Sequence, residues 1–242
     1  MKKVLIASVV TVGMALPAAA ADMATKAPIY KAPSAVAAYD WSGFYIGANG
    51  GFAWSEKCWF SVNQARDEGC HNPSGGVAGG QLGYNWQFGN FVVGVEGTGD
   101  WSDFNAGRPS VLNPAVTLNS NVNGIFTAAA RVGGAWNNWL FYGKGGAAWV
   151  RDNYNEVFLG QVATVGSETR SGWLAGVGTE VGITNNLSVG VEYDYAGLGT
   201  TTVRFSPAAP QFTAFDERIR QNLQTVTVRL NYRWGGPVVA KY

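Results

Sequence analysis

The chain has 242 residues, of which 47% are hydrophobic, 13% aromatic and only 14% charged, and it contains 33 glycines. Ordinary globular chains carry about 25% charged residues, so this composition is unusual for a water-soluble domain. The formal net charge of +1 provides no basic surface and argues against a nucleic-acid partner.

The N-terminus has the parts of an export signal. Lys2 and Lys3 precede an apolar stretch, 4–16, which is shorter than the ~20 residues that a membrane-spanning helix needs. Small residues at 19–21 then fit a cleavage site. We therefore expect 1–21 to be a cleaved signal peptide, and an N-terminal membrane anchor is the alternative.

The rest of the chain divides by pattern. Residues 22–40 contain Pro28 and Pro33 and show no periodicity, which predicts a flexible periplasmic linker. From residue 41 onward the chain alternates with period two, as β-strands do. This pattern predicts an outer-membrane β-barrel over 41–234 and a C-terminal tail over 235–242.

Eight strands are predicted within the barrel, and their connections alternate between long and short. The strands lie near 42–54, 76–87, 91–101, 122–136, 140–150, 171–183, 187–197 and 223–234. The long connections are about 55–75, 102–121, 151–170 and 198–222. The short ones, rich in the Asn and Gly residues that favour tight turns, are 88–90, 137–139 and 184–186. Outer-membrane barrels have short periplasmic turns and long external loops, so both ends of the domain are expected in the periplasm.

Each predicted strand has a bulky apolar face and a face of small or polar residues. Val228 and Leu230, for example, alternate with Thr227 and Arg229. A soluble barrel would turn the bulky face inward. However, the polar faces are rich in glycine, which a water-facing strand has little reason to prefer. The bulky faces are therefore predicted to meet lipid.

Aromatic residues gather towards the strand ends, as in the girdles at the two borders of a membrane barrel. The predicted girdle residues are Phe44, Trp54, Trp86, Phe88, Trp101, Trp136, Tyr232 and Trp234. The sequence thus predicts an all-β fold, an eight-stranded antiparallel transmembrane β-barrel with short periplasmic turns and four long external loops.

Three segments, 41–47, 79–87 and 231–242, resemble the small outer-membrane proteins of alphaproteobacteria, the porin-family immunogenic proteins of Brucella and the rhizobia. The resemblance covers the whole mature chain. It implies an eight-stranded barrel with roles in envelope integrity and host contact. Some relatives are described as haem-binding, but no loop motif here matches that activity, so no cofactor is expected.

Charged residues on the polar faces form the first candidate site, a lumen charge network of Glu96, Arg131, Glu180, Glu192 and Arg229, with Asp100, Asp194 and Arg233 nearer the strand ends. An eight-stranded barrel is just wide enough for side chains to fill it, so buried charges must be paired. A structural plug is expected, and a polar path for ions is the alternative. Lys144 shares parity with apolar neighbours. Its face is ambiguous, although Lys facing mid-bilayer lipid costs ~2–4 kcal/mol, which favours the lumen.

Cys58 and Cys70 are the two cysteines of the chain, and both fall in the first predicted loop. Export to an oxidising compartment predicts a disulfide between them. A metal site with His71 is the alternative, but it lacks a fourth ligand, and no metal is expected.

Catalysis has little support in the sequence. Serine–histidine chemistry needs a histidine beside a nucleophile, and His71 is the only histidine. An aspartate pair drawn from Asp100, Asp103 and Asp194 is formally possible. We expect no catalytic residues and no enzyme activity.

The expected function is that of an integral outer-membrane structural and surface-interaction protein, which supports envelope integrity and contact with a host or the environment. Its expected partners are outer-membrane lipid, lipopolysaccharide and surface ligands at the external loops. One alternative is a narrow, porin-like diffusion pore. Another is ligand capture by loop aromatics that either form a pocket or pack on one another, namely Trp59, Phe60, Tyr154, Phe158, Phe212 and Phe215.

Overall fold

The computed structural model describes residues 39–63, 65–110, 115–208 and 214–234; the predicted signal peptide, most of the predicted linker and the predicted tail lie outside them. Within these ranges no helix is long and apolar enough to cross a membrane. The strands are β1 (Gly43–Ser61), β2 (Arg66–His71), β3 (Ser74–Phe88), β4 (Phe91–Pro109), β5 (Val116–Trp136), β6 (Trp139–Phe158), β7 (Gln161–Gly182), β8 (Leu187–Pro207) and β9 (Phe215–Trp234).

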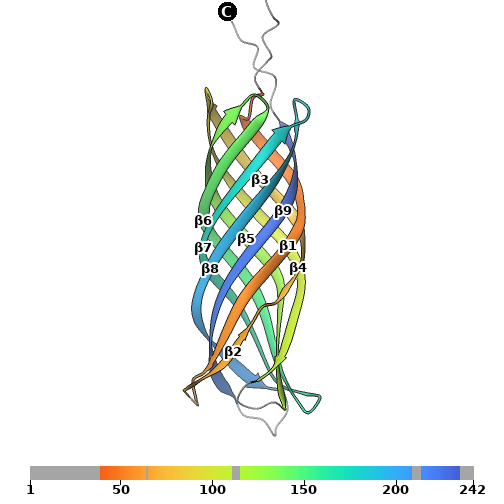
Figure 1. Cartoon of the computed structure of the whole chain (residues 1–242), viewed down its shortest axis with the longest axis vertical. Helices are drawn as coiled ribbons and strands as arrows, with labels where there is room; N and C mark the ends of the chain where they lie inside the picture. The colour runs from red at the N-terminus through yellow and green to blue at the C-terminus, as the bar shows by residue number, and fades with distance from the viewer. Residues whose placement is uncertain (1–38, 64, 111–114, 209–213, 235–242) are drawn as a thin grey trace, which may run out of the picture. The chain divides into compact units, whose positions relative to one another are not determined.

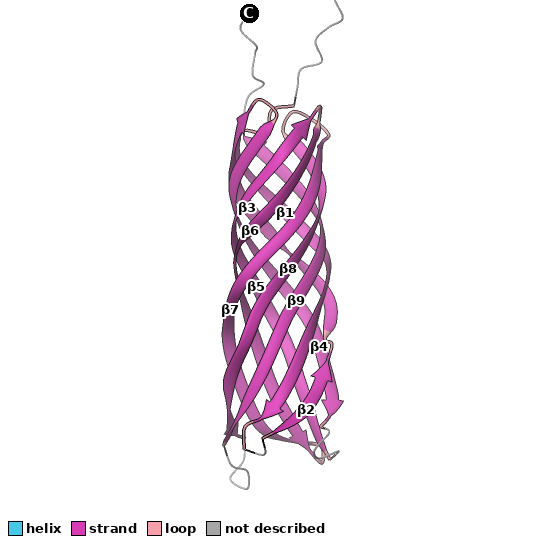
Figure 2. Ribbon diagram, turned by 60° about the vertical axis from the view of Figure 1, so that its left-hand side comes forward, coloured by secondary structure: helices cyan, strands magenta, loops and turns pink. Residues whose placement is uncertain are grey.

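Eight of these strands close into an antiparallel barrel, as predicted. β1 pairs with β3, each later strand pairs with the next, and β9 returns to β1 (Figure 1). The short strand β2 pairs with β1 beyond the point where β3 stops. Following paired residues once around the ring leads from Trp54 back to Phe44, which lies ten residues (54 − 44) earlier in β1. The strands are therefore strongly tilted, as Figure 2 also shows.

Tight turns join the strands at one end of the barrel, which we call the turn end. The β3–β4 and β5–β6 hairpins have two-residue turns, with Gly89 at φ 62° and Asn137 at φ 55°. These residue types accept the left-handed conformation that such turns require. Arg233 closes this end, because its Nη1 donates to the Ser42 carbonyl at 2.9 Å and its guanidinium lies 4.8 Å from the centre of the Tyr39 ring.

At the opposite end, which we call the loop end, most of the predicted loop residues are strand. β1 runs on to Ser61, and the β6–β7 connection is reduced to Leu159 and Gly160. The strand pattern continues there, but with its polarity exchanged: in β9, Ile219 is buried while Arg218 and Arg220 are exposed. The sequence prediction ended each strand where the outward face stopped being apolar, so it read these extensions as loops.

The predicted girdle residues lie on the outward face in two bands. The turn-end band contains Phe44, Trp86, Phe88, Trp136, Tyr232 and Trp234, all at least 44% exposed. Trp54 and Trp101 lie towards the loop end, together with Phe126, Trp149 and Trp173. Ten residues separate Phe44 from Trp54 in β1. In a tilted strand this corresponds to about 25 Å along the axis, the height of the apolar band of outer-membrane barrels.

Candidate functional site

The strands bring six charged side chains together inside the lumen, towards the turn end. We call them the charge cluster: Glu96 on β4, Arg131 on β5, Lys144 on β6, Glu180 on β7, Glu192 on β8 and Arg229 on β9. Each residue is at most 6% exposed. The five residues of the network predicted from sequence are therefore neighbours. Lys144, whose face the sequence left open, points inward with them.

Two arginines join the carboxylates across the bore. Arg229 makes ion pairs with both Glu96 and Glu192. Arg131 Nη1 lies 3.0 Å from Glu180 Oε1 and 3.4 Å from Glu96 Oε2. Glu96, on β4, thus contacts one arginine from the neighbouring strand β5 and one from β9, which is not a neighbour of β4. Such contacts span the lumen and hold several strands to one another.

Lys144 completes the charge balance. Its Nζ lies 2.7 Å from Glu192 Oε1, 2.9 Å from Asp194 Oδ2 and 3.6 Å from Glu96 Oε1. Three cations therefore face the three glutamates of the cluster, and Asp194 lies at its edge. Buried charges are tolerated only when they are paired and hydrogen-bonded in this way.

Two tyrosines link the charge cluster to the barrel wall. Tyr45 Oη donates a hydrogen bond to Glu96 Oε2, and Tyr142 Oη donates one to Glu192 Oε2, both at 2.7 Å. The guanidinium of Arg131 lies 4.6 Å from the centre of the Tyr45 ring and 4.9 Å from that of Tyr142, within cation–π range. Sequence reasoning missed these roles because it expected aromatic residues on the lipid face.

Inward glycines provide the space for these rings. A side chain at Gly83 would collide with Tyr45, and one at Gly178 would collide with Tyr142. The glycine-rich polar faces seen in the sequence therefore have a packing role, because a large ring on one strand lies over a glycine on the next.

Neutral polar residues complete the bonding of the cluster. Ser188 Oγ and Asn231 Nδ2 each donate to Glu180 Oε2 at 3.0 Å, and Arg131 Nε donates to Asn85 Oδ1 at 2.9 Å. From the sequence, parity alone could place these residues on the polar face, but it could not identify the groups to which they bind.

Beyond the charge cluster the interior becomes apolar. We call this level the apolar layer: Ala53, Val77, Val122, Ile125, Ala129, Ala148, Val150, Leu174, Ala196, Leu198 and Leu223. A cavity of about 20 Å³ lies between it and the cluster, lined by Asp100 and Asp194 among others. This volume has room for about one water molecule. The bore is therefore closed at this level by side chains.

A buried ion pair forms the next level. Lys57 Nζ lies 2.7 Å from Asp152 Oδ1, and both side chains are 0% exposed. Burial lowers the pKa of the Lys57 ammonium from its usual range, although Asp152 opposes the shift. Nearby, Arg170 Nη1 donates to Gln221 Oε1 at 3.0 Å. The sequence prediction missed this level because all four residues lie in the predicted loops.

An aromatic cluster fills the loop end of the lumen. Its members are Trp59, Leu118, Tyr154, Val203, Phe205 and Ile219, with Val116 and Phe215 packed against them. The Trp59 ring centre lies 5.6 Å from those of both Tyr154 and Phe205. Trp59 and Tyr154 are only 1% and 2% exposed. These two aromatics therefore pack on one another, as one of the two interpretations of the loop aromatics expected.

Two of the remaining predicted loop aromatics, Phe60 and Phe158, are not part of this core. Phe60 lies on the outward face, where Arg218 is 5.5 Å from its ring centre. Phe158 is partly buried at the end of β6, and Phe212 lies outside the described residues.

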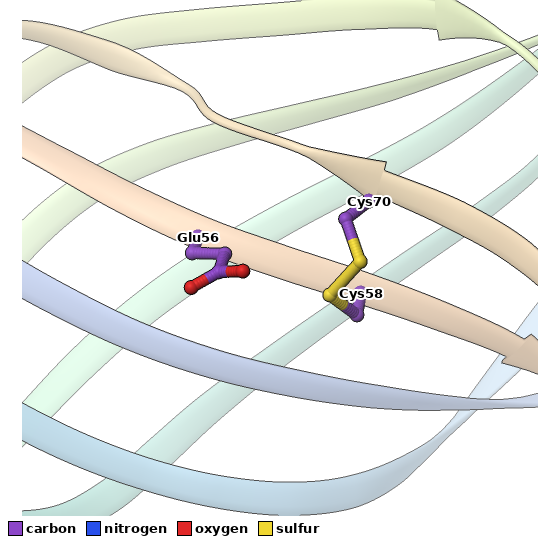
Figure 3. A group of neighbouring side chains, drawn as sticks. All are labelled: Glu56, Cys58 and Cys70. Carbon is purple, nitrogen blue, oxygen red and sulfur yellow. A yellow bond between two sulfur atoms is a disulfide. The ribbon is translucent and has the colours of Figure 1, made fainter.

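Cys58 and Cys70 form the predicted disulfide, which ties β1 to β2 (Figure 3). Cys58 alternates with the buried Lys57 and Trp59 and so lies on the outward face. Glu56 is near the two sulfur atoms, but bonded sulfurs are not thiolate ligands. His71 is buried, with its Nε2 3.1 Å from Ser120 Oγ in the interior. The histidine and the cysteines therefore lie on opposite faces, contrary to the metal alternative.

The contact between His71 and Ser120 contains two of the groups that nucleophilic enzymes use. However, Ser120 is 1% exposed and His71 9% exposed, and the His71 ring centre lies 6.0 Å from that of Trp59. At this burial the serine hydroxyl is not presented to a substrate carbonyl. The geometry therefore fits a buried hydrogen bond within the loop end.

An apolar outward band between aromatic girdles, around a filled polar lumen, defines an integral outer-membrane β-barrel. The sequence model of the outer membrane protein beta-barrel domain family matches residues 8–234. The 31 kDa outer-membrane immunogenic protein of Brucella melitensis biotype 1 is 34% identical over 253 residues, covering 97% of this chain and 100% of that protein. The chain belongs to this family of outer-membrane β-barrel proteins and is located in the outer membrane.

Two further comparisons agree. The 22 kDa outer membrane protein of Rhizobium leguminosarum bv. viciae is 32% identical over 174 residues, covering 71% of this chain and 68% of that protein. The crystal structure of the outer membrane protein OprG from Pseudomonas aeruginosa matches with a TM-score of 0.51 at 13% identity, covering 81% of this chain and 97% of that chain. At this identity the second comparison shows the fold alone.

Proposed function

We propose that the protein is a sealed barrel, which serves the outer membrane as a structural component and presents its loop end to the surroundings. The filling of the lumen carries this proposal. The charge cluster, the apolar layer, the Lys57–Asp152 pair and the aromatic cluster follow one another along the bore. A barrel filled in this way supports the membrane and the outer surface without passing solutes.

The partners in this proposal are the lipid and lipopolysaccharide around the barrel, and surface or host ligands at the loop end. The immunogenic names of the Brucella relatives support exposure at the cell surface. We assign no reaction to the chain: Asp100 and Asp194 line a cavity of only about 20 Å³, and His71 and Ser120 are buried.

A narrow diffusion pore is the competing account, and single-channel conductance of the refolded chain in planar bilayers separates the two. We expect no steady conductance from the wild type. Trp59→Ala alone should also stay closed, since the charge cluster still fills the bore. Arg229→Ala combined with Trp59→Ala should open measurable events. The matched outward-facing pair, Arg220→Ala with Phe60→Ala, should not. Steady conductance of the wild type would overturn the sealed-barrel proposal.

A further inference from the structure

Two adjoining hollows lie on the outward face of the barrel, just beyond the loop-end girdle. The girdle-side hollow, of about 570 Å³, is lined by Trp101, Phe126, Arg151 and Asn153 among others. The rim-side hollow, of about 880 Å³, is lined mainly by polar residues, including Asn153 again. Because both hollows share Asn153, they form one track that leads from the membrane border towards the rim.

Four asparagines form the centre of the rim-side hollow. Asn119 pairs with Asn155, and Asn121 pairs with Asn153, across β5 and β6. They alternate with buried residues such as Tyr154, so their side chains face outward. Directly paired residues lie ~5 Å apart, so the four amides make one continuous patch, the asparagine tetrad. Asparagine is disfavoured in strands, which makes four at paired positions a feature that packing does not explain.

The chemistry of the asparagine tetrad suits a sugar. An amide side chain offers both donors and an acceptor, and a sugar hydroxyl also donates and accepts. Ser167 and Ser206 line the same hollow and add two hydroxyl groups, and Arg204 adds a positive charge. The hollow is therefore polar, largely uncharged and extended along the strands, as an oligosaccharide site would be.

Arg151 gives the track an anion site at the membrane border. It follows the girdle residue Trp149 by two positions and is exposed. Its paired neighbours are Gly124 on β5 and Thr169 on β7, neither of which is acidic. None of the ion pairs found among the described residues includes Arg151. A guanidinium in this position is suited to bind a phosphate through two parallel hydrogen bonds.

We propose that this track binds a phosphorylated glycolipid of the outer leaflet. Its acyl part lies against Trp101 and Phe126, its phosphate pairs with Arg151, and its sugars cross the asparagine tetrad. The order of apolar, cationic and amide groups along the track matches the order of acyl, phosphate and sugar groups in such a lipid. The inference rests on the proposed function, which names lipopolysaccharide as a partner, and it assigns the binding to particular residues.

Titration of the refolded full-length barrel in detergent tests the assignment, with bound lipid measured by native mass spectrometry. The probes are purified rough lipopolysaccharide, its dephosphorylated form, and the core oligosaccharide released from its lipid. Arg151→Gln should weaken binding of the intact lipid about tenfold and leave the dephosphorylated form unchanged. The double variant Asn121→Ala and Asn153→Ala should weaken binding of both lipid forms several-fold. Circular dichroism and heat-dependent gel mobility verify that each variant is folded.

Arg220 supplies the matched control. It is exposed on the outward face of β9, forms none of the ion pairs found, and lines neither hollow. Arg220→Gln should change binding by less than about twofold. If it weakens binding as much as Arg151→Gln does, the attraction is general and the site is wrong. If the free oligosaccharide binds as tightly as the intact lipid, the ligand is a soluble glycan and the glycolipid assignment is wrong. Either result leaves the conductance test of the sealed barrel unaffected.

Discussion

The two halves of the barrel have opposite polarity along the same strands. Between the girdles, β9 turns Val228 and Leu230 outward and Arg229 inward. Beyond the loop-end girdle, it turns Ile219 inward and Arg218 outward. The backbone ladder continues through both halves, because β9 pairs with β1 from Trp234 to Glu217. What changes is the solvent around the barrel, from hydrocarbon to water.

The difference shows how the surroundings dictate the core. In the membrane half, lipid covers the outer face, so the hydrophobic effect does not drive the interior to be apolar, and paired charges fill it. In the loop-end half, water surrounds the outer face, and burial of apolar side chains is again favourable. The loop end therefore has a core like that of a soluble protein, reinforced by a disulfide. Substitutions in the core of the membrane half should therefore destabilise the whole barrel, whereas substitutions in the core of the loop-end half should open that half alone.

The largest effect is expected in the membrane half, from Arg229→Ala. The substitution leaves Glu96 and Glu192 without their common arginine inside the bore. Loss of one partner from a buried ion pair commonly costs ~3–5 kcal/mol. Because the charge cluster joins strands across the barrel, the free energy of global unfolding should fall by this amount. Urea unfolding in lipid bilayers measures it. The exposed Arg220→Ala is the control and should stay within about 0.5 kcal/mol; equal losses from both would contradict a specific role of the cluster.

In the loop-end half, Trp59→Ala should be the next most damaging change. Truncation of a buried tryptophan costs ~3–5 kcal/mol, and the lower end applies here because the loop end borders water and can partly collapse. We expect local opening: amide hydrogen exchange should accelerate in 56–61 and 217–221, while the urea midpoint of the membrane half hardly moves. Phe60→Ala, on the outward face next to it, should leave exchange unchanged. A large drop in the global midpoint would mean that the halves unfold as one unit.

The sequence predicted the membrane half well because one simple rule holds there. Glu96 and Arg229 are polar residues in strands whose other face is apolar, so parity alone assigned them to the lumen. Their spacing around the ring could not be predicted, since it depends on the shear of the barrel. The contact of Arg229 with Glu96 follows from that shear and not from the adjacency of their strands.

The loop end was harder to predict because its pattern contradicts the rule. Tyr154 points inward from β6, while Asn153 and Asn155 point outward, so alternation persists there with exchanged polarity. Alternation tested without regard to sign would have extended β6 through these residues. The partner of Lys57 could not have been found in this way, because Asp152 lies 95 residues away and their contact depends on the closed ring.

A smaller effect is expected from removal of the disulfide by Cys58→Ser with Cys70→Ser. The two cysteines are 12 residues apart. Closure of a loop of this size contributes about 3 kcal/mol in the chain-entropy model, and measured values are often lower. The loss should be confined to β2 and the end of β1, and it should appear as faster protease cleavage near Arg66 on the folded barrel. Reduction of the wild type with a thiol should reproduce it. If cleavage of the two forms is the same, the pairing of β1 with β2 does not depend on the disulfide.

The smallest effect is expected when the Lys57–Asp152 pair is replaced as a whole. Lys57→Met alone should open the loop end, because it leaves the Asp152 carboxylate buried without its cation. In Lys57→Met with Asp152→Leu, both charges are gone and apolar side chains adjoin the aromatic cluster, so loop-end stability should lie within about 1 kcal/mol of the wild type or above it. Hydrogen exchange in 56–61 reports both variants. Replacement of both Arg229 and Glu192 by apolar residues should not recover stability in the same way. Glu96 would then lose its contact with Arg229, and Lys144 would lose its contact with Glu192. If the double variant at Lys57 and Asp152 is destabilised as much as Lys57→Met alone, the loop end, like the membrane half, depends on its charges.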